Sequence, residues 1–210
     1  MSAEQAETHL GTLSVFELMP GAVDSLPPDQ TAVLECFQVS PADTALMQDL
    51  MENTGIYEPN TVARRLGQGR WGFAGRMGQT EIVTYGWVAL DATSVGPTGL
   101  DFVPPIGDAY LFDFATLPAH RGHGYYPFLL RFIQHHLAKH SLRRAWIATA
   151  PGNDKSARSI ARAGFTKVAD TLFVPSSPLQ PAYIKLFAAP GINPALVELG
   201  YQAHVPNAFY

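Results

Sequence analysis

The chain has 210 residues, of which 47% are hydrophobic and 15% are charged, and its formal net charge is −4. This composition predicts one globular domain with a sizeable core and excludes a disordered chain. The negative charge gives no support for binding to nucleic acid or to an anionic membrane, so neither is expected as a partner.

Cysteine content and apolar runs narrow the class of protein further. The single cysteine, Cys36, excludes an internal disulfide framework, and its place in the apolar run 33–39 predicts a buried structural thiol. No segment reaches the ~18 apolar residues that a membrane span needs. The N-terminal sequence lacks a basic region followed by an apolar one, as a signal peptide would have, so a cytoplasmic protein is expected.

The distribution of proline and glycine divides the chain into three parts. Residues 1–30 are predicted to form an N-terminal arm, with one short strand at 13–18. Residues 31–187 carry the regular patterns of a single domain. Residues 188–210 are apolar but contain Pro190, Gly191, Pro194 and Pro206, so this tail is expected to pack on its own domain or on a partner subunit.

Hydrophobic periodicity predicts alternating strands and helices between these ends. Strands are predicted at 32–39, 70–76, 81–90, 110–115, 144–150, 166–174 and 183–187, and helices at 41–53, 60–66 and 153–163. A further helix is predicted after Gly124, with Leu129, Phe132, Ile133 and Leu137 on one face. Ser40 can cap the helix that Pro41 begins, and Leu46, Leu50 and Met51 would form its apolar stripe. Residues 91–108 are predicted to form a long loop, a feature that is often functional. The pattern indicates a mixed α/β domain with a central sheet.

A strand, a glycine turn and a helix follow one another between residues 110 and 131. Gly122 and Gly124 precede the helix, whose first turn has unpaired N–H groups and the positive end of the helix dipole. Glycines let this backbone come close to a ligand, so the turn is a candidate cradle for a phosphate. The local pattern supports a merely tight turn equally well. Neither the P-loop motif nor the full dinucleotide-binding glycine motif is present.

Two sequence blocks resemble the GNAT superfamily of N-acetyltransferases. The family's cofactor loop has Gln or Arg, a glycine three residues later, and Gly or Ala two residues after that. Arg121 and Gly124 match it, whereas Tyr126 stands where Gly or Ala is usual. Asn153, Ser156 and Gly164-Phe165 resemble the second block, in the right order and at the family's spacing.

The resemblance implies the α/β (α+β) GNAT fold, with six to seven mostly antiparallel strands and helices around them. It also implies a splay between the fourth and fifth strands that admits the pantetheine arm of acetyl-CoA. The residues implied in cofactor binding are Phe114, Ala115, Thr116 and Leu117 on the strand, Arg121, Gly122, His123, Gly124, Tyr125 and Tyr126 in the cradle, and Asn153 and Ser156 in the second block.

Amide formation from a thioester requires a neutral amine, stabilisation of the developing oxyanion and usually protonation of the leaving thiolate. The tyrosine that the family often uses as acid stands seven residues after the asparagine, where this chain has Ile160. Tyr125, Tyr126 or a water would then supply the proton. Asp113 is the candidate base, predicted to share a strand face with Leu111 and Ala115.

Each of these residues also has a structural interpretation. For Asp113, a structural salt bridge is as good an explanation as a catalytic role. Glu81 and Asp108 are weaker candidates for the base. The aromatic residues of the 70–90 hairpin fit a core better than an acceptor pocket. The seven histidines include none at zinc-protease spacing with a carboxylate partner, so no metal site is expected.

The resulting hypothesis is an acetyl-CoA-dependent N-acetyltransferase that acts on a primary amine by direct attack. The alternative is a GNAT-like protein that binds CoA without chemistry, as a sensor or scaffold, and Ile160 is its main support. The acceptor would be a small-molecule or peptide amine, and the net charge slightly favours a cationic or neutral one. The apolar tail suggests a homodimer.

Overall fold

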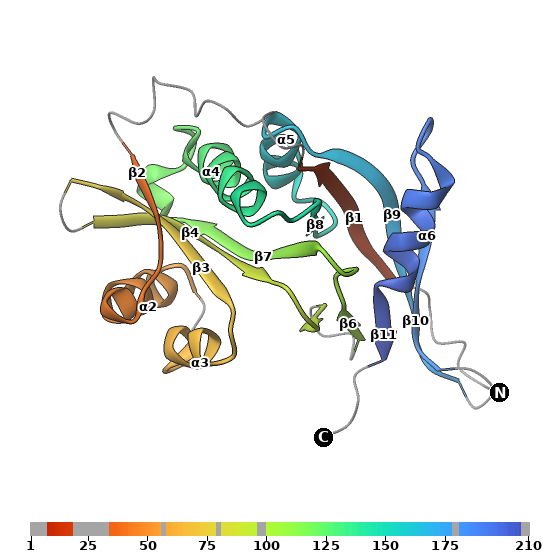
Figure 1. Ribbon diagram of the computed structural model, residues 1–210, viewed down its shortest axis with the longest axis horizontal. Coiled ribbons are helices and arrows are strands. Elements are labelled where there is room, and N and C mark those ends of the chain that lie inside the picture. Colours follow the sequence, from red (N-terminus) through yellow and green to blue (C-terminus); the bar gives the residue numbers. More distant parts are fainter. Residues whose placement is uncertain are drawn as a thin grey trace.

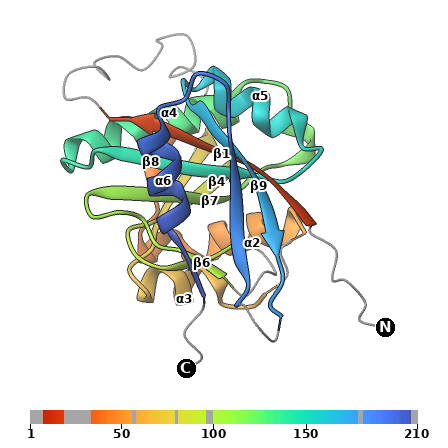
Figure 2. The same ribbon diagram turned by 90° about the vertical axis from the view of Figure 1, so that its right-hand side faces the viewer.

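The structure is a computed structural model that describes residues 8–18, 34–55, 58–78, 81–95, 100–177 and 181–206. An eight-stranded sheet runs through the molecule in the order β10-β9-β1-β8-β7-β4-β3-β2. Helices α4 and α5 cover one face of this sheet, and α2, α3 and α6 lie on the other (Figures 1 and 2). This mixed, mostly antiparallel sheet with helices on both faces confirms the predicted fold class, with one strand more than the six to seven expected.

The elements follow the predicted pattern along most of the chain. The strands of the large sheet are β1 (Thr8–Glu17), β2 (Glu35–Gln38), β3 (Trp71–Met77), β4 (Glu81–Ala89), β7 (Asp108–Thr116), β8 (Arg144–Thr149), β9 (Thr166–Val174) and β10 (Tyr183–Ala188). The helices are α2 (Thr44–Asn53), α3 (Thr61–Gly67), α4 (Tyr125–Lys139), α5 (Asp154–Arg162) and α6 (Pro194–Gln202), with short 3-10 turns η1 (Pro41–Asp43) and η3 (Pro118–His120).

Strands β7 and β8 form the one parallel pair of the described sheet, and they separate along their length. Their pairing runs from Asp108 opposite Arg144 to Leu111 opposite Ile147 and stops there. Strand β7 continues to Thr116 and keeps its pairing with β4 on the other side, as far as Thr84 opposite Thr116. The last residues of β7 therefore offer a free backbone edge in the middle of the sheet, where the family resemblance implies a splay.

The N-terminal segment differs from the expected arm. Strand β1 lies inside the sheet, paired with β8 on one side and β9 on the other. Leu13 and Val15 alternate into the core, with 1% and 3% of their surfaces exposed. The predicted short strand at 13–18 is thus part of a longer strand that starts at Thr8, and its central place in the sheet depends on pairing with strands far along the chain. The rest of the predicted arm lies outside the described residues.

Two further segments contain strands or a helix that the sequence analysis did not predict. The predicted loop 91–108 contains β5 (Thr93–Ser94) and β6 (Leu100–Phe102), which join β11 (His204–Pro206) in a small three-stranded sheet. Phe102 is fully buried and stacks on Tyr110 at 4.3 Å between ring centroids. The described part of the tail packs on its own domain, because α6 places its apolar side on a cluster that includes Leu13 and Trp146.

Pro41 begins the 3-10 turn η1, for which Ser40 is the N-cap, whereas α2 starts at Thr44 and buries a different stripe from the one predicted. The Asp43 carboxylate accepts hydrogen bonds from the backbone N–H and the hydroxyl of Ser40, at 2.8 and 2.6 Å. Met47, Leu50 and Met51 form the buried stripe, whereas Leu46 is 46% exposed. Leu50 and Met51 stay in the stripe, and Met47 joins them because positions i, i+3 and i+4 share one face of a helix.

Among the described residues, no helix is long and apolar enough to cross a membrane. Cys36 is partly buried on β2, and burial raises the pKa of its thiol to about 12, so the thiol stays protonated at neutral pH. This agrees with the predicted structural role of the cysteine.

Candidate active site

The turn between β7 and α4 has the geometry of an anion cradle. Gly122 and Gly124 adopt the left-handed region, with φ of 86° and 78°, which only glycine enters without strain. Helix α4 begins at Tyr125 directly after Gly124, so Pro127 falls in the first turn, where its missing N–H costs nothing. The space beside Gly122 is open, because an added Cβ would meet no atom within 4 Å.

This turn forms one end of a cleft of about 510 Å3 between β7, the start of α4 and α5. All but two of the residues expected to bind a cofactor line it: Phe114, Ala115, Thr116, Arg121, Gly122, Gly124, Tyr125, Tyr126, Asn153 and Ser156. The structure therefore brings together the free edge of β7, the glycine turn and the second sequence block, which are up to 42 positions apart in the chain (114 to 156).

Leu117 and His123 are the two that do not line the cleft. Leu117 packs against two apolar clusters, one on the α2 and α3 side of the sheet and one that includes Tyr125 and Phe128 of α4. Its N–H donates to the Val83 carbonyl at 2.9 Å. His123 is exposed and stacks on the Tyr125 ring at 5.6 Å. Their backbone positions still belong to the strand end and the turn, but their side chains point elsewhere.

Helix α5 adds a basic face that the sequence analysis missed. Lys155, Arg158 and Arg162 line the cleft together with Arg121, and no carboxylate lies among the lining residues that the structure describes. Their i, i+3 and i+7 spacing puts the three α5 side chains on one side of the helix, and this periodicity was the signal that could have found them. The cleft is thus a concentrated site of positive charge on a chain of net charge −4.

Asn153, Ser156 and Tyr126 meet at the junction of α4 and α5. Asn153 caps α5, since its side-chain oxygen accepts the Ser156 N–H at 3.1 Å. The Ser156 hydroxyl lies 3.4 Å from the Tyr126 hydroxyl oxygen. Burial raises the pKa of Tyr126 to about 12, although the Ser156 hydrogen bond lowers it, so this phenol remains protonated and able to donate.

Tyr125 is a weaker candidate for the acid than Tyr126, and Ile160 cannot serve as one. The Tyr125 ring is buried in a cluster with Leu34, Val83 and Phe128, although part of it reaches the cleft. Ile160 is 2% exposed and packs in the core beneath α4 and α5. The position where the family often has a tyrosine is therefore a packing position in this chain.

Asp113 shares a sheet face with Ala115 but not with Leu111, so the prediction that all three lie on one face was wrong. A bulge in the β4–β7 ladder places two residues of β7, Asp113 and Phe114, opposite one residue of β4, and Asp113 takes the left-handed conformation with φ of 52°. Leu111 consequently packs beneath α4 and α5, whereas Ala115 packs on the α2 and α3 side.

The Asp113 carboxylate lies on the α2 and α3 side of the sheet. It forms a salt bridge with Arg65 of α3, and its other oxygen accepts from the Tyr85 hydroxyl at 3.5 Å. Both members of the salt bridge are less than one-fifth exposed. Asp113 therefore forms the structural salt bridge that was predicted as one of its two roles. It also lies just beyond the point where β7 separates from β8.

The other candidates have structural roles. Asp108 is buried and accepts hydrogen bonds from Arg144 Nε at 2.9 Å and Trp146 Nε1 at 2.8 Å. Glu81 contacts His120 Nε2 at 3.2 Å on the exposed side of the turn. The hairpin residues Phe73, Tyr85 and Trp87 are fully buried core residues, whereas the partly buried Trp71 packs against His136 and His140, which stack on each other at 4.5 Å.

A model of the acetyltransferase (GNAT) family matches residues 48–165, more than half of the chain. The chain belongs to this family. The match runs from α2 to the residue before β9, so it includes the glycine turn, α4 and α5. No curated protein matches the chain.

Solved structures with the same fold include several GNAT proteins. An acetyltransferase from Colwellia psychrerythraea is 13% identical with a TM-score of 0.56, over 78% of this chain and 55% of that one. AAC(6')-Iy, in complex with the bisubstrate analogue CoA-S-monomethyl-acetylneamine, is 15% identical with a TM-score of 0.55, over 69% and 98%. AAC(6')-Ih from Acinetobacter baumannii, an aminoglycoside 6'-N-acetyltransferase, is 13% identical with a TM-score of 0.53, over 69% and 98%.

At sequence identities of 13–15%, these similarities show a shared fold and not a shared activity. The GNAT chain described here spans little more than half of the Colwellia protein and 62% of a second similar structure, an acetyltransferase from Novosphingobium aromaticivorans.

Proposed function

We propose that this GNAT protein is an acyl-CoA-dependent N-acetyltransferase, which transfers the acetyl group of acetyl-CoA to a primary amine by direct attack. The observation that carries the proposal is the basic cleft at the free edge of β7. The aminoglycoside N-acetyltransferases among the similar structures support an amine as acceptor.

The residues of the cleft fit CoA in charge and in shape. The backbone N–H groups of the turn, from Gly122 to Tyr126, and the basic side chains beside them suit the phosphate groups of CoA. Arg121 is held in place because its Nε donates to the Thr116 carbonyl at 3.0 Å. The unpaired edge of β7 offers hydrogen bonds to the amides of a pantetheine arm, as a sheet edge does to an added strand.

Acetyl-CoA supplies the thioester carbonyl on which the amine acts. The amine nitrogen forms a bond to the carbonyl carbon, the carbon–sulfur bond breaks, and the amine proton leaves to Asp113 or to a water near it. The departing sulfur takes up a proton from water. The Tyr126 hydroxyl is the best-placed group to give this sulfur a hydrogen bond, because it lines the cleft and stays protonated.

A second candidate function is binding of CoA without chemistry, as a sensor or scaffold. Ile160 supports it, because the usual acid is replaced by a core residue. The two functions share the cofactor cleft and differ only in turnover. Release of free CoA from acetyl-CoA, in the presence of amines and above the rate without protein, therefore separates them.

The test of the cleft is calorimetry and thermal shift with acetyl-CoA, CoA, dephospho-CoA and ATP. We expect CoA species to bind more tightly than ATP and to raise the melting temperature by mass action. Gly124→Glu, which puts a carboxylate at the cradle, and Arg158→Gln, which removes one cation without changing the turn, should both weaken this binding.

Arg76→Gln is the matched control, because Arg76 pairs with Glu35 at the far edge of the sheet. Wild-type protein that fails to bind any CoA species would exclude the acetyltransferase function and the CoA-sensor function together.

A further inference from the structure

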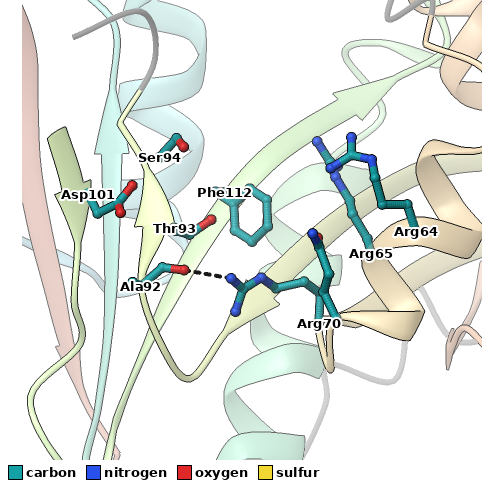
Figure 3. A pocket seen from close by; sticks show the side chains of 9 residues that line it. Arg64, Arg65, Arg70, Ala92, Thr93, Ser94, Asp101 and Phe112 are labelled. Carbon is teal, nitrogen blue, oxygen red and sulfur yellow. Dashed lines mark hydrogen bonds between the residues drawn. The ribbon is translucent and has the colours of Figure 1, made fainter. Parts of the chain in front are cut away.

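A second pocket of about 330 Å3 lies on the sheet face opposite α4 and α5. Its lining comes from α3, the residue before β3, strand β5, strand β6 and the middle of β7. Figure 3 shows the arginines of α3 on one side, Thr93 and Asp101 on the other, and the Phe112 ring between them. None of the residues expected to bind the cofactor belongs to this lining.

The two pockets meet at strand β7. Phe112 lines the second pocket, whereas Phe114 and Ala115 line the basic cofactor cleft. Between them lies Asp113, at the bulge where β7 has already parted from β8. A ligand in the second pocket therefore approaches the splay from the face that the cofactor cleft does not use, which is the arrangement a two-substrate transfer needs.

The lining of the second pocket is unusually rich in cationic donors. Arg64, Arg65 and Arg70 line it, with Gln68, Thr93 and Ser94 as further donors, and Asp101 is the only carboxylate among the lining residues described. A guanidinium group has five N–H donors, arranged to match carboxylate or phosphate oxygens. Such a lining recognises an anion far better than a polyamine.

The arginines are positioned by partners that leave donors free for a ligand. Arg64 pairs through one terminal nitrogen with Glu58 at 2.6 Å, and Glu58 is 68% exposed. Arg70 pairs with Asp91, which is 69% exposed, and also donates to the Ala92 carbonyl, as Figure 3 shows. Ion pairs with such exposed partners contribute little and can be exchanged for a ligand.

Arg65 and Arg70 are close enough to influence each other. The Arg65 guanidinium lies 5.1 Å from the Trp87 ring centroid and 5.3 Å from that of Phe112, so two aromatic faces fix its position. The pKa of Arg70 is lowered, mainly by burial and also by the Arg65 charge, while Asp101 raises it. An anion between these two arginines would offset both the burial and the repulsion.

We propose that the amine acceptor of this enzyme also carries an anionic group, a carboxylate or a phosphate, which Arg64 and Arg70 bind while Arg65 anchors to Asp113. The proposal rests on the N-acetyltransferase function proposed above. It reverses the expectation from net charge, because the whole chain is acidic but the pocket is lined by cations. It also separates this protein from aminoglycoside acceptors, which are polycations.

Binding is tested by calorimetry with four amines in the presence of saturating CoA. The probes are γ-aminobutyrate for a carboxylate, aminoethyl phosphate for a phosphate, butylamine as a neutral-tailed control and 1,4-diaminobutane as a dication. We expect at least one anionic amine to bind about tenfold or more tightly than butylamine, since hydrogen bonds to charged groups are the strong ones. The carboxylate and phosphate arms identify which anion the pocket prefers.

Three variants and one control assign the effect to the pocket. Arg64→Gln and Arg70→Gln should each weaken the anionic amine about tenfold and leave butylamine unchanged. Asp101→Asn should act in the opposite direction, with tighter binding of the anionic amine. Arg76→Gln, whose guanidinium pairs with Glu35 outside the pocket, should change nothing. Because Arg64 is half-exposed and Asp101→Asn raises affinity, loss of folding cannot imitate the whole pattern.

Turnover of acetyl-CoA with the same four amines then separates the two proposals. Anionic amines that bind through Arg64 and Arg70 without release of free CoA would support the anion pocket and overturn the acetyltransferase function. Equal binding of all four amines, preference for the diamine, absence of binding, or indifference to the arginine variants would overturn the anionic acceptor. Release of CoA with neutral or dicationic amines would leave the acetyltransferase function standing in that case.

Discussion

Asp113 and Arg65 form a salt bridge that joins the bulge of β7 to α3, at the place where the two pockets of the protein meet. Asp113 is therefore a candidate for two tasks, which Asp113→Asn and Arg65→Lys together can separate. As a base it would accept a proton from the amine, and as a partner it holds the Arg65 guanidinium over the Trp87 and Phe112 rings.

Asp113→Asn is expected to lower kcat about a hundredfold or more, because general-base catalysis typically contributes ~10²–10⁴-fold. The steady-state rate of CoA release, measured as a function of pH, checks this. Arg65→Lys is the companion variant, since it keeps the charge but loses the planar fork. A rise in KM alone, with kcat and the pH profile retained, would make Asp113 a positioning residue only.

Tyr126→Phe is expected to lower kcat about tenfold with little change in the KM for acetyl-CoA. A phenol with a pKa of about 12 holds its proton more tightly than a thiol does, so it acts as a hydrogen-bond donor to the departing sulfur. Losing one hydrogen bond to a charged group costs about this much in rate. Tyr125→Phe is the control variant, because the Tyr125 ring packs in an apolar cluster. An equal fall of kcat in both variants would contradict the role given to the Tyr126 hydroxyl.

The Phe114 ring occupies the space that a side chain at position 86 of β4 would need. An added Cβ would lie 1.9 Å from Phe114 Cε1. Gly86→Ala should therefore destabilise the protein by about 1–3 kcal/mol, as overpacking does, and push the ring toward the cofactor cleft. Urea denaturation measures the first effect and CoA affinity the second. Gly67→Ala is the control, since an added Cβ there meets nothing, and unchanged stability of Gly86→Ala would refute the packing argument.

The sequence predicted the parts of this fold that depend on local chemistry. The glycine turn is one of them, because Gly122 and Gly124 adopt backbone angles that other residues avoid. The Asn153 cap and the helix it begins are another, and strand β9 has the predicted bounds, Thr166–Val174. These elements also line the cleft between β7, α4 and α5, so most of its lining could be named from motifs alone.

The rest depended on contacts between distant segments, which no local pattern contains. The bulge at Asp113 reverses the facing of the residues after it, and a bulge inserts one residue without a composition signal. The second pocket, which is lined by arginines, combines α3 with β5 and β6. These two strands lie in a stretch whose sequence predicts a loop. Strand β1 is central only because β8 and β9, more than 120 positions later, leave room for it.

His204 links the stability of the C-terminal tail to pH. It lies on β11, its Nδ1 donates to the Gly200 carbonyl at 2.7 Å, and its ring packs edge-on against Phe102 at 5.2 Å. Burial lowers the pKa of His204 to about 4, against a partial increase from the Gly200 hydrogen bond. The folded protein therefore keeps this imidazole neutral at pH values where the unfolded chain protonates it.

The sign of the pH effect follows from proton binding. Between the unfolded pKa of ~6.5 and the folded value of about 4, the unfolded state binds more protons, so stability falls as pH falls through this window. Acidification from pH 6.5 to 5 should cost the wild type at most ~2 kcal/mol more than His204→Gln, at ~1.4 kcal/mol per pKa unit. Urea denaturation at pH 7.5, 6.5, 5.5 and 5.0 measures both slopes, and His123→Gln, which alters an exposed histidine, should keep the wild-type slope. Parallel slopes for wild type and His204→Gln would show that the tail does not hold this histidine neutral.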